Sequence, residues 1–482
     1  MSDSTAKQTT TDMSDNPRVL FGRRKLFSNV EEVTADNVVE VLANVSLDLL
    51  TDQMEEDYLY GYYKGKQPIL SRVKEIRSDI NHKIVKNHAF EIVSFHTGYR
   101  LGEPVQYVGR DLPTDKSDDL AKLNRYMLIE GAHPKNKELE DWRNICGTGY
   151  KMALPSDGDA PFEIYVPDPR QAAVIYSTQI GQRPLCGLYF VKDSDNQIRF
   201  SVYTDKMYYE VKNGEVVAER PHVLGMIPII EYPANTARLG SFEPALSLLD
   251  EINDVESNRA DAVAQFVQSL CLAINLDLPE GTTSQTIAET GILAFNSVDG
   301  NKAEFKILSE QLDQDQTQTL IDDLYERVLR IVGMPSQSDG STSDSSNNGA
   351  VILKNGWENA EARAKDSEAE FKRSEQQFLK LIINICNKTR NSKLDLTPGD
   401  IDIKFTRRNY QDTVSKATVL TMLLNNDKVA PIDAFVMCGA FPDPDDACKR
   451  GLAWYEQNKV VGQNEAVELS EEEVTDAETP TA

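Results

Sequence analysis

Carboxylate side chains gather on two segments of this chain, and clustered carboxylates can bind a divalent cation or transfer protons. The first segment lies within residues 239–271 and the second within residues 309–333. The acidic residues that stand out are Asp250, Glu251, Asp254, Asp322 and Asp323. Because the chain has a formal net charge of −26 at pH 7, neighbouring acids are mostly solvated faces. We therefore predict no dedicated metal site and interpret both segments as acidic faces.

The motifs of nucleotide, metal and nucleophile chemistry are missing from the sequence. The nearest approach to a phosphate loop is Gly65-Lys66-Gln67, which lacks the hydroxyl that would hold magnesium. No Gly-x-Ser-x-Gly or His-Glu-x-x-His motif occurs. Glu91 and His96 are an acid and an imidazole close together, and we interpret them as structural. The sequence predicts a protein that is not an enzyme and needs no cofactor.

Cysteine usage and hydropathy exclude two further classes of protein. No two cysteines form a Cys-x-x-Cys pair, which predicts buried free thiols rather than a metal site. The six are Cys146, Cys186, Cys271, Cys386, Cys438 and Cys448. No apolar run is long enough to cross a bilayer, and the first residues lack a signal-peptide core. We expect a protein made and kept in the cytoplasm during its assembly, with no membrane partner.

Size and charge restrict the architecture and the partners. A chain of 482 residues is too long for one hydrophobic core, so several packed regions are expected. The strongly acidic balance argues against gripping nucleic acid through a basic surface. Any contact with DNA is therefore expected to be loose, local or repulsive.

Two helices should position the carboxylates. The apolar residues of 242–270 and of 312–332 recur at helical spacing and should pack on a neighbouring helix, partly from another subunit. The packing residues are Leu249, Ile252, Val255, Leu324 and Val328, and the stripe of the second helix also includes Leu320 and Ile331. On the first helix the acidic face continues through Glu256 and Asp261, with only Arg259 against it.

The remaining pattern predicts an α+β chain that is predominantly helical. A helix is expected over 34–50 that continues over 52–63, with further helices over 120–146 and 350–388 and three short ones between 414 and 456. Short alternating segments over 162–223 predict an antiparallel β-region, in which Asn213-Gly214 marks a hairpin. A small β-excursion should separate the two acidic helices, and 401–405 should return as a strand.

One ordered series of segments resembles the portal proteins of long-tailed, siphovirus-type double-stranded DNA bacteriophages. It includes the strand Ile-Pro-Ile-Ile-Glu-Tyr at 227–232, then Asn235, Gly240 and the acidic helix, with Tyr60–Gly65 and Gly98–Val105 upstream. The resemblance runs with gaps from about Asp57 to Tyr410. It implies a ring, usually of twelve subunits, at one capsid vertex in the virion.

The resemblance also implies a division of the chain and a set of partners. The implied regions are a tail (1–25), a wing (26–238), stem helix 1 (239–271), a clip (272–308), stem helix 2 (309–333), a tunnel loop (334–349), a long helix with a return strand of the wing (350–412), a helical crown (413–460) and an acidic tail (461–482). DNA would pass without sequence specificity by the acidic stem and by Ser341, Asn347, Asn348 and Lys354. The implied protein partners are the large terminase subunit, the head-completion or connector protein, and the major capsid and scaffold proteins.

Two other classes of function stay open at this point. A long-helix scaffold or adaptor would need the same apolar helix faces without any passage of DNA. A metal-dependent nucleic-acid-processing enzyme would use the acids to chelate magnesium, although the sequence holds no compact constellation of Asp, Glu and Lys. A ring with an open axial channel would separate the portal from both alternatives.

Overall fold

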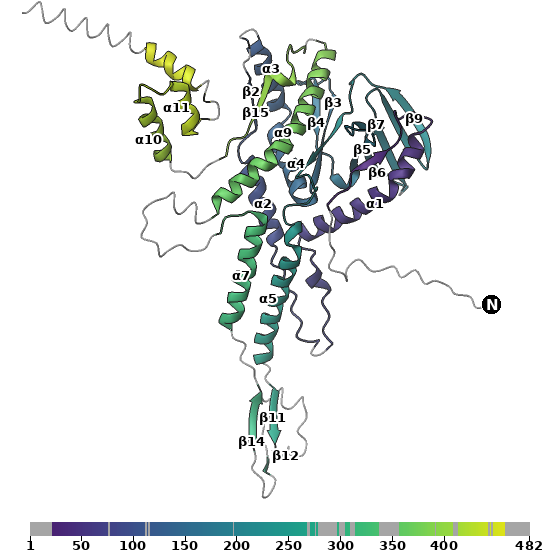
Figure 1. Ribbon diagram of the computed structural model, residues 1–482. Helices are drawn as coiled ribbons and strands as arrows, with labels where there is room; N and C mark the ends of the chain where they lie inside the picture. Colours follow the sequence, from purple (N-terminus) through teal and green to yellow (C-terminus); the bar gives the residue numbers. More distant parts are fainter. Residues whose placement is uncertain are drawn as a thin grey trace, which may run out of the picture. The chain divides into compact units, whose positions relative to one another are not determined.

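The computed structural model describes most of the chain, and its described residues divide into two compact units (Figure 1). The helical-pair unit comprises the described residues of 57–92 and 242–333, and the sheet unit those of 22–56, 93–241 and 334–482. The residues described are 22–75, 78–110, 113, 116–195, 197–267, 270–274, 276–277, 296–297, 304–308, 314–336, 356–390, 392–407, 413–441, 444 and 447–457.

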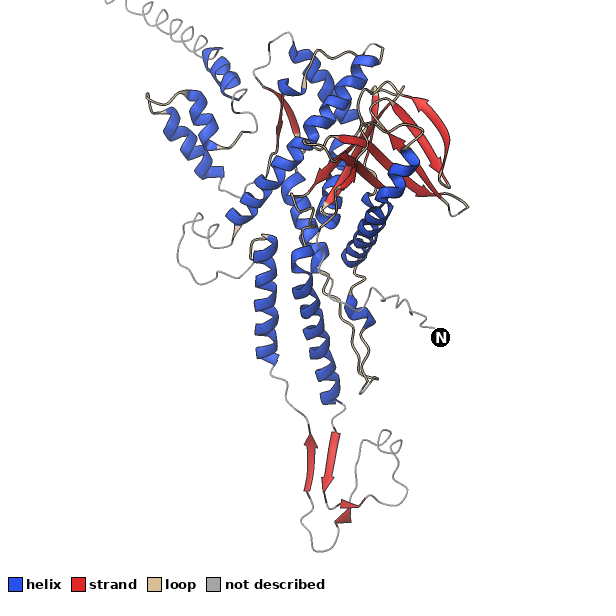
Figure 2. Cartoon of the chain, turned by 45° about the vertical axis from the view of Figure 1, so that its right-hand side comes forward, coloured by secondary structure: helices blue, strands red, loops and turns tan. Residues whose placement is uncertain are grey.

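The helical-pair unit is built on two long helices, which both views show side by side (Figures 1 and 2). They are α5 (Leu246–Val267) and α7 (Gln314–Val332). The short helix η4 (Glu243–Ala245) leads into α5, with Pro244 in its first turn, and η1 (Pro68–Ser71) contacts α5. Between α5 and α7 in the chain, β11 (Leu270–Ile274) pairs with β14 (Glu304–Leu308), and β12 (Leu276–Asp277) pairs with β13 (Asn296–Ser297). The predicted pair of helices separated by a β-excursion is confirmed.

The sheet unit contains a six-stranded sheet in the order β1-β5-β6-β7-β8-β9. Its strands are β1 (Leu26–Ser28), β5 (Ala172–Ser177), β6 (Pro184–Lys192), β7 (Ile198–Tyr203), β8 (Met207–Lys212) and β9 (Glu215–Pro221). Neighbours from β5 to β9 are antiparallel, whereas β1 adds to β5 in parallel. Asn213 and Gly214 take positive φ angles of 54° and 76°, which the two-residue hairpin between β8 and β9 requires. The predicted antiparallel region and its hairpin are confirmed.

A second, three-stranded sheet has the order β10-β3-β4, so β10 is an edge strand. Its strands are β3 (Thr148–Pro155), β4 (Phe162–Tyr165) and β10 (Ile229–Pro233). Edge position explains why Pro233, which has no N–H to donate, is tolerated in β10. Separately, β2 (Gln106–Gly109) pairs antiparallel with β15 (Ile401–Lys404), which confirms the predicted return strand.

Helices elsewhere in the chain confirm one prediction and correct another. Residues 34–63 hold one continuous helix, α1 (Val38–Tyr63), as predicted, because no Gly or Pro interrupts 38–60. Residues 120–146 hold two, because Gly131 takes φ 61° and ends the first. Those two are α3 (Ser117–Ile129) and α4 (Ala132–Cys146). The others are α2 (His88–Leu101), α9 (Trp357–Lys388), α10 (Thr413–Leu424) and α11 (Pro431–Cys438), with short turns η3 (Pro169–Gln171) and η5 (Pro398–Asp400).

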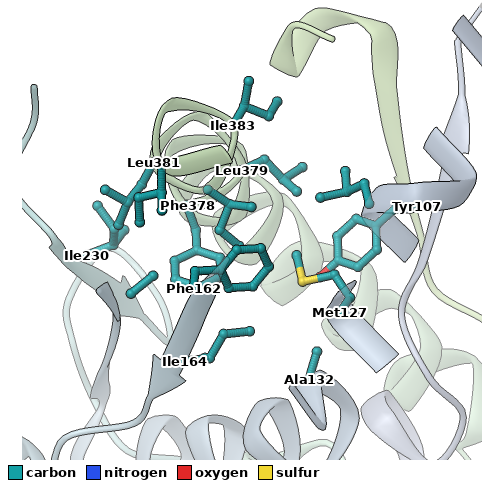
Figure 3. Close-up of a cluster of buried hydrophobic side chains, with 14 of the residues drawn as sticks. Tyr107, Met127, Ala132, Phe162, Ile164, Ile230, Phe378, Leu379, Leu381 and Ile383 are labelled. Carbon is teal, nitrogen blue, oxygen red and sulfur yellow. The ribbon is translucent and has the colours of Figure 1, made fainter. Parts of the chain in front are cut away.

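Helix α9 crosses the three-stranded sheet and forms the main core with it (Figure 3). Its 32 residues span about 48 Å at roughly 1.5 Å per residue, shorter than the forty residues predicted, and it starts after Gly356 at φ 80°. Phe378, Leu379 and Leu381 of the helix lie with Phe162 of β4 and Ile230 of β10. A second core packs α1 on the six-stranded sheet through Val38, Val41, Leu42 and Val45.

A fully buried ion pair fixes α9 against that sheet. The ammonium of Lys151 on β3 lies 3.0 and 3.1 Å from the two carboxylate oxygens of Glu375 on α9. The hydroxyls of Tyr107 and Tyr232 each donate to Glu375 at 2.6 Å, and Lys151 also donates to Asn136 at 2.8 Å. Because every lone pair and proton has a partner, the pair specifies one position of the helix rather than adding much net stability.

The sequence placed residues 57–92 with the rest of 26–238, in one region. The structure instead assigns 57–92 to the helical-pair unit, and the division falls inside helices α1 and α2. The reason is tertiary, because residues 62–86 bind side chains of α5 that lie about 170 to 190 positions later in the chain.

Candidate functional site

The apolar faces of α5 and α7 meet inside a single chain. Leu249, Ile252 and Val328 are buried, while Val255 and Leu324 are half-buried. These five residues were predicted to face a neighbouring helix, and the two helices contact each other within one protomer. Their part in packing between subunits stays a prediction.

The buried stripe of α7 differs from the predicted one. Leu320 and Ile331 were expected to lie on it, but their side chains are 46% and 37% exposed. The face turned inward carries Ile321, Val328, Leu329 and Val332 instead. Apolar residues occupy two adjacent faces of this helix, and spacing alone did not distinguish the face that meets α5.

Four of the five predicted channel carboxylates lie at the surface. Glu251 and Asp254 on α5 and Asp322 and Asp323 on α7 are exposed. Asp323 pairs with Arg327 at 2.9 Å one turn later, and Asp322 accepts a hydrogen bond from Gln318 at 2.7 Å. Exposed pairs of this kind contribute little stability. These acids are therefore not needed for folding, and they present their charge to the surroundings of the helices.

Asp250, the fifth, does not belong to the exposed face. It is half-buried and accepts a hydrogen bond of 2.8 Å from the hydroxyl of Tyr62. Burial raises the pKa of Asp250 to about 6, a shift that the Tyr62 hydrogen bond opposes and Asp254 reinforces. Tyr62 in turn stacks on Phe242 with ring centroids 5.9 Å apart. Tyr62 of α1 therefore packs between Phe242 and Asp250.

Three buried polar side chains along α5 bind the backbone of an extended segment, residues 82–86. The amide of Lys86 donates to Asn253 Oδ1 at 2.8 Å, that of Ile84 to Ser257 Oγ at 3.0 Å, and that of His82 to Asp261 Oδ1 at 2.7 Å. We call these contacts the strap ladder. Four residues of helix rise about 6.0 Å and two residues of strand about 6.6 Å, so the two repeats match.

The far end of the strap ladder is charged. Asp261 also receives Lys74 and the ring Nδ1 of His82, the latter at 2.8 Å, with Arg72 at 3.4 Å. Burial alone would raise the pKa of Asp261, but these hydrogen bonds and cations hold it below its ordinary value. Lys86 also forms an ion pair with Glu256 of α5. Asp261 and Glu256 were assigned to the acidic face from the sequence, but in the structure cations of residues 72–86 neutralise both.

Sequence reasoning missed this ladder, although its signal was present. Asn253, Ser257 and Asp261 are hydrogen-bonding residues at spacing i, i+4 and i+8, which places them on one face of a helix. Polar residues on a buried helix face need partners, so such a stripe predicts a segment lying along it. Periodicity of apolar residues alone gave no reason to look for one.

The acid and imidazole that were singled out have other partners. Glu91 accepts from His88 Nδ1 at 2.8 Å and from the hydroxyl of Tyr325 on α7 at 2.7 Å. The hydrogen bond from His88 lowers the pKa of Glu91, and burial opposes it. The imidazole that Glu91 binds is that of His88, one turn earlier on the same helix, rather than that of His96. This cluster ties α2 to α7.

The described residues hold no group of three or more His, Cys, Asp or Glu that could bind a metal ion. Cys146, Cys186, Cys386, Cys438 and Cys448 are buried free thiols, as predicted, and the side chain of Cys271 lies outside the description. Within the described part of the chain, no helix has the length and apolar character that a membrane span needs.

Comparison with known proteins assigns the family. Residues 52–434 match the model of the family described as phage portal protein, SPP1 Gp6-like, which is more than half of the chain. The chain belongs to the phage portal protein family. The resemblance inferred from the sequence is thereby confirmed, and a structural role in the phage particle follows.

Solved structures with low sequence identity also match this portal chain. A chain from the neck of a native GTA particle, computed with C12 symmetry, is 13% identical, covers 73% of this chain and 90% of its own, and gives a TM-score of 0.41. A chain from the neck of an empty GTA particle, computed with C6 symmetry, is 12% identical with the same coverages and a TM-score of 0.42. Among curated proteins, no significant match is found.

Several predicted features of the portal lie outside the described residues. Ser341, Asn347, Asn348 and Lys354, which the resemblance placed at a tunnel loop, are among them. Most of the predicted clip, residues 272–308, is also outside, except for its paired strands. These assignments remain predictions.

Proposed function

We propose that this chain forms the ring of a phage portal at one capsid vertex, with a channel through which double-stranded DNA is packaged and ejected. The observation that carries the proposal is the construction of the helical-pair unit. Two helices bury their apolar faces against each other and hold Glu251, Asp254, Asp322 and Asp323 on the outside. Membership of the portal family supports the same assignment.

The surface chemistry suits a channel for a sliding polyanion. Each phosphate neutralised by a fixed Lys or Arg adds affinity and releases counterions, so a basic wall would bind DNA and slow it. A wall of carboxylates repels the backbone and keeps the duplex away from the surface. Glu251 and Asp254 lie on α5 between the face that packs on α7 and the face of the strap ladder. The contacts on these two faces therefore fix the direction of the two carboxylates.

The strap ladder gives the helix a defined rotation about its own axis. Helix α5 packs on α7 and buries Leu249 and Ile252, and another of its faces binds residues 82–86 through Asn253 and Ser257. The stripe that stays exposed carries Ser247, Glu251, Asp254 and Asn258. In the proposed ring this stripe faces the bore, together with Asp322 and Asp323 of α7.

The remaining regions take the roles that the family resemblance implies. Residues 26–56 and 93–238 with the return strand form the wing, 239–271 and 309–333 the stem, and 413–460 the crown. Residues 57–92, which the resemblance placed in the wing, pack with the stem helices. In the ring, twelve copies of this chain would meet through stem, wing and crown. The major capsid and scaffold proteins would surround the wing.

Residues 272–308 are proposed as the clip that meets the large terminase subunit during packaging and the head-completion or connector protein afterwards. Their paired strands follow α5 directly and return into α7, so the insertion is displayed by the two stem helices. Deleting residues 279–289 should leave ring formation intact and abolish packaging driven by the terminase. Normal packaging by that variant would refute the clip assignment.

Residues 334–349 are proposed as the tunnel loop that contacts DNA. Their composition, rich in Ser, Asp, Asn and Gly, suits weak contacts with no base preference. Cysteines introduced at Ser341 and Asn347 should lose reactivity toward a thiol reagent once DNA fills the particle. Equal labelling of empty and filled particles would place the loop away from the bore.

The portal function itself is tested by imaging and by charge reversal. Electron microscopy of the purified full chain should show rings with an axial channel. The variant Glu251→Lys with Asp254→Lys should form rings and slow DNA packaging, because it adds phosphate-binding groups to the bore. Glu215→Lys, an exposed reversal on β9, is the matched control and should package at the normal rate. Rings without a channel, or equal rates for both variants, would refute the assignment.

A further inference from the structure

The sheet unit contains a cavity that the portal function does not use. Its volume is about 750 Å³, within the range of small-ligand sites. The turn between β5 and β6, the edge strand β10, residue Lys25 before β1, and helix α9 supply its walls. Every residue of the lining belongs to the sheet unit, so the cavity is complete within that unit.

The walls carry more positive than negative charge. Four cations line the cavity from separate parts of the chain, and the carboxylates in the lining are Asp205 and Glu231. The cations are Lys25, Arg183, Arg238 and Arg373. This is unusual in a chain with a net charge of −26, and it concentrates positive potential at one place.

Two of these cations are neutralised by nearby carboxylates. Arg238 binds both oxygens of Glu231, at 2.7 and 3.2 Å, and Glu231 also receives the hydroxyl of Tyr176. Arg373 pairs with Glu370 at 2.9 Å on the same helix. With Glu231 occupied by Arg238, the other two cations share the lining with one further carboxylate, that of Asp205.

The other two cations have neutral oxygens as hydrogen-bond acceptors. Lys25 Nζ donates to the amide oxygen of Gln182 at 3.0 Å, and Arg183 donates to the backbone carbonyl of Glu31 at 2.6 Å. Burial, reinforced by the charges of Arg238 and Arg373 and opposed by those of Glu231 and Glu370, lowers the pKa of Lys25. Lys25 and Arg183 are therefore positioned to bind an anion without first breaking an ion pair.

Backbone strain marks the same place. Within the described residues, three residues other than glycine have a positive φ, and two of them, Gln182 (42°) and Arg238 (55°), line this cavity. Such residues cost of order 1 kcal/mol or more each and persist where the surrounding structure holds them. Here the strained residues carry the amide that orients Lys25 and the guanidinium that binds Glu231.

We propose that this cavity binds carboxylate groups of an acidic polypeptide segment. Lys25 and Arg183 would receive the carboxylates, and the amides of Gln179 and Gln377 would bind peptide groups beside them. Ile227 and Ile229 provide an apolar wall for the intervening side chains. The net charge of −26 repels a long polyphosphate at a distance, which favours a short acidic peptide over nucleic acid.

The occupant is the acidic segment 465–482 of the same sequence, which holds seven Asp and Glu in 18 positions. The probe is a fluorescent peptide with the sequence of residues 465–482, titrated with full-length protein and with a variant that lacks those residues. The shortened variant should bind the peptide more tightly, because its cavity has no competing segment. Equal binding by both proteins would show that this segment does not occupy the cavity.

The contact residues are tested with the same probe by fluorescence anisotropy. Lys25→Gln and Arg183→Gln should each weaken binding by roughly tenfold, as expected for the loss of one charge-assisted hydrogen bond. Lys428→Gln, an exposed lysine on another part of the chain, is the matched control and should bind normally. Gln377→Glu, which adds a carboxylate at an exposed position of α9, should weaken binding without disturbing the fold.

Two results would overturn the proposal. Equal affinity of wild type, Lys25→Gln, Arg183→Gln and Gln377→Glu would show that the cavity is not the site. Tighter binding of a single-stranded DNA oligonucleotide than of the peptide would identify a nucleic-acid site instead. A peptide in which every acid is replaced by its amide should not bind. Ring formation and packaging provide a separate readout, so failure here leaves the portal assignment untouched.

Discussion

The sheet unit and the helical-pair unit are stabilised by different interactions. In the sheet unit, α9 and α1 bury large apolar clusters, and the charges of Lys151 and Glu375 are enclosed with all their partners. In the helical-pair unit, α5 binds the backbone of residues 82–86 through Asn253, Ser257 and Asp261. This second unit also leaves Val263 of α5 51% exposed, and Leu320 and Ile331 of α7 are exposed too.

The difference lies in what holds each unit together, since both units leave large apolar side chains exposed. Leu128 and Ile180 of the sheet unit are exposed, as is Leu320 of α7. In the proposed ring, the next copy of the chain covers part of this surface. We therefore expect substitutions at the buried ion pair of the sheet unit to act on folding and substitutions at the exposed apolar residues of α7 to act on assembly.

The largest effect is expected from breaking the buried ion pair. Lys151→Met leaves the carboxylate of Glu375 buried without its cation and should lower the free energy of unfolding by about 3–5 kcal/mol. Arg327→Met breaks the exposed pair with Asp323 and should change it by less than about 1 kcal/mol. Urea denaturation of the unassembled chain measures both. Similar values for the two variants would contradict the contrast between the units.

The next effect separates folding from assembly within the helical-pair unit. Ile252→Ala opens a cavity in a fully buried position and should cost about 3 kcal/mol of stability in the unassembled chain. Leu320→Ala, at a position that is 46% exposed, should cost less than about 0.5 kcal/mol there yet weaken the ring. Denaturation and sedimentation velocity give the two readouts. Full ring stability in Leu320→Ala would remove this residue from the subunit interface.

The strap ladder is expected to contribute a smaller, local effect. Ser257→Ala removes the acceptor of the Ile84 amide and should lower stability by about 1–2 kcal/mol. Hydrogen exchange of the Ile84 amide should accelerate more than that of amides in α7. Ser247→Ala, an exposed serine on the same helix, is the control and should leave the exchange unchanged. Unaltered protection of Ile84 in Ser257→Ala would show that the ladder does not hold the segment.

A pH-dependent term of similar size is expected at Asp250. Burial raises its pKa to about 6 in the folded chain, against about 4 when unfolded. Between those pH values the unfolded chain binds fewer protons than the folded chain. The free energy of unfolding should therefore fall as the pH rises from about 4 to 6. After discounting for partial exposure, the loss is about 1 kcal/mol. Asp250→Asn should flatten this part of the pH profile, and an unchanged slope would contradict the assignment.

Local sequence determined the elements with strong patterns. The apolar spacing of 242–270 and 312–332 predicted α5 and α7, and Asn213-Gly214 predicted the β8–β9 hairpin, because both signals depend on residues near in sequence. The ordered motifs from Asp57 onward also gave the family. The break at Gly131 was missed, although the glycine that ends α3 was present in the sequence.

Tertiary structure alone decided how the faces of those elements are used. Leu320 and Val328 belong to the same helical pattern, but only Val328 is buried. Three acids of the predicted acidic face are instead bound by residues distant in the chain, since Tyr62 binds Asp250, Lys86 binds Glu256 and Lys74 binds Asp261. Likewise, nothing near Lys151 in sequence indicates Glu375, 224 residues later. The physical reason is that local preference sets the type of an element, whereas burial and charge pairing depend on which distant surface packs against it.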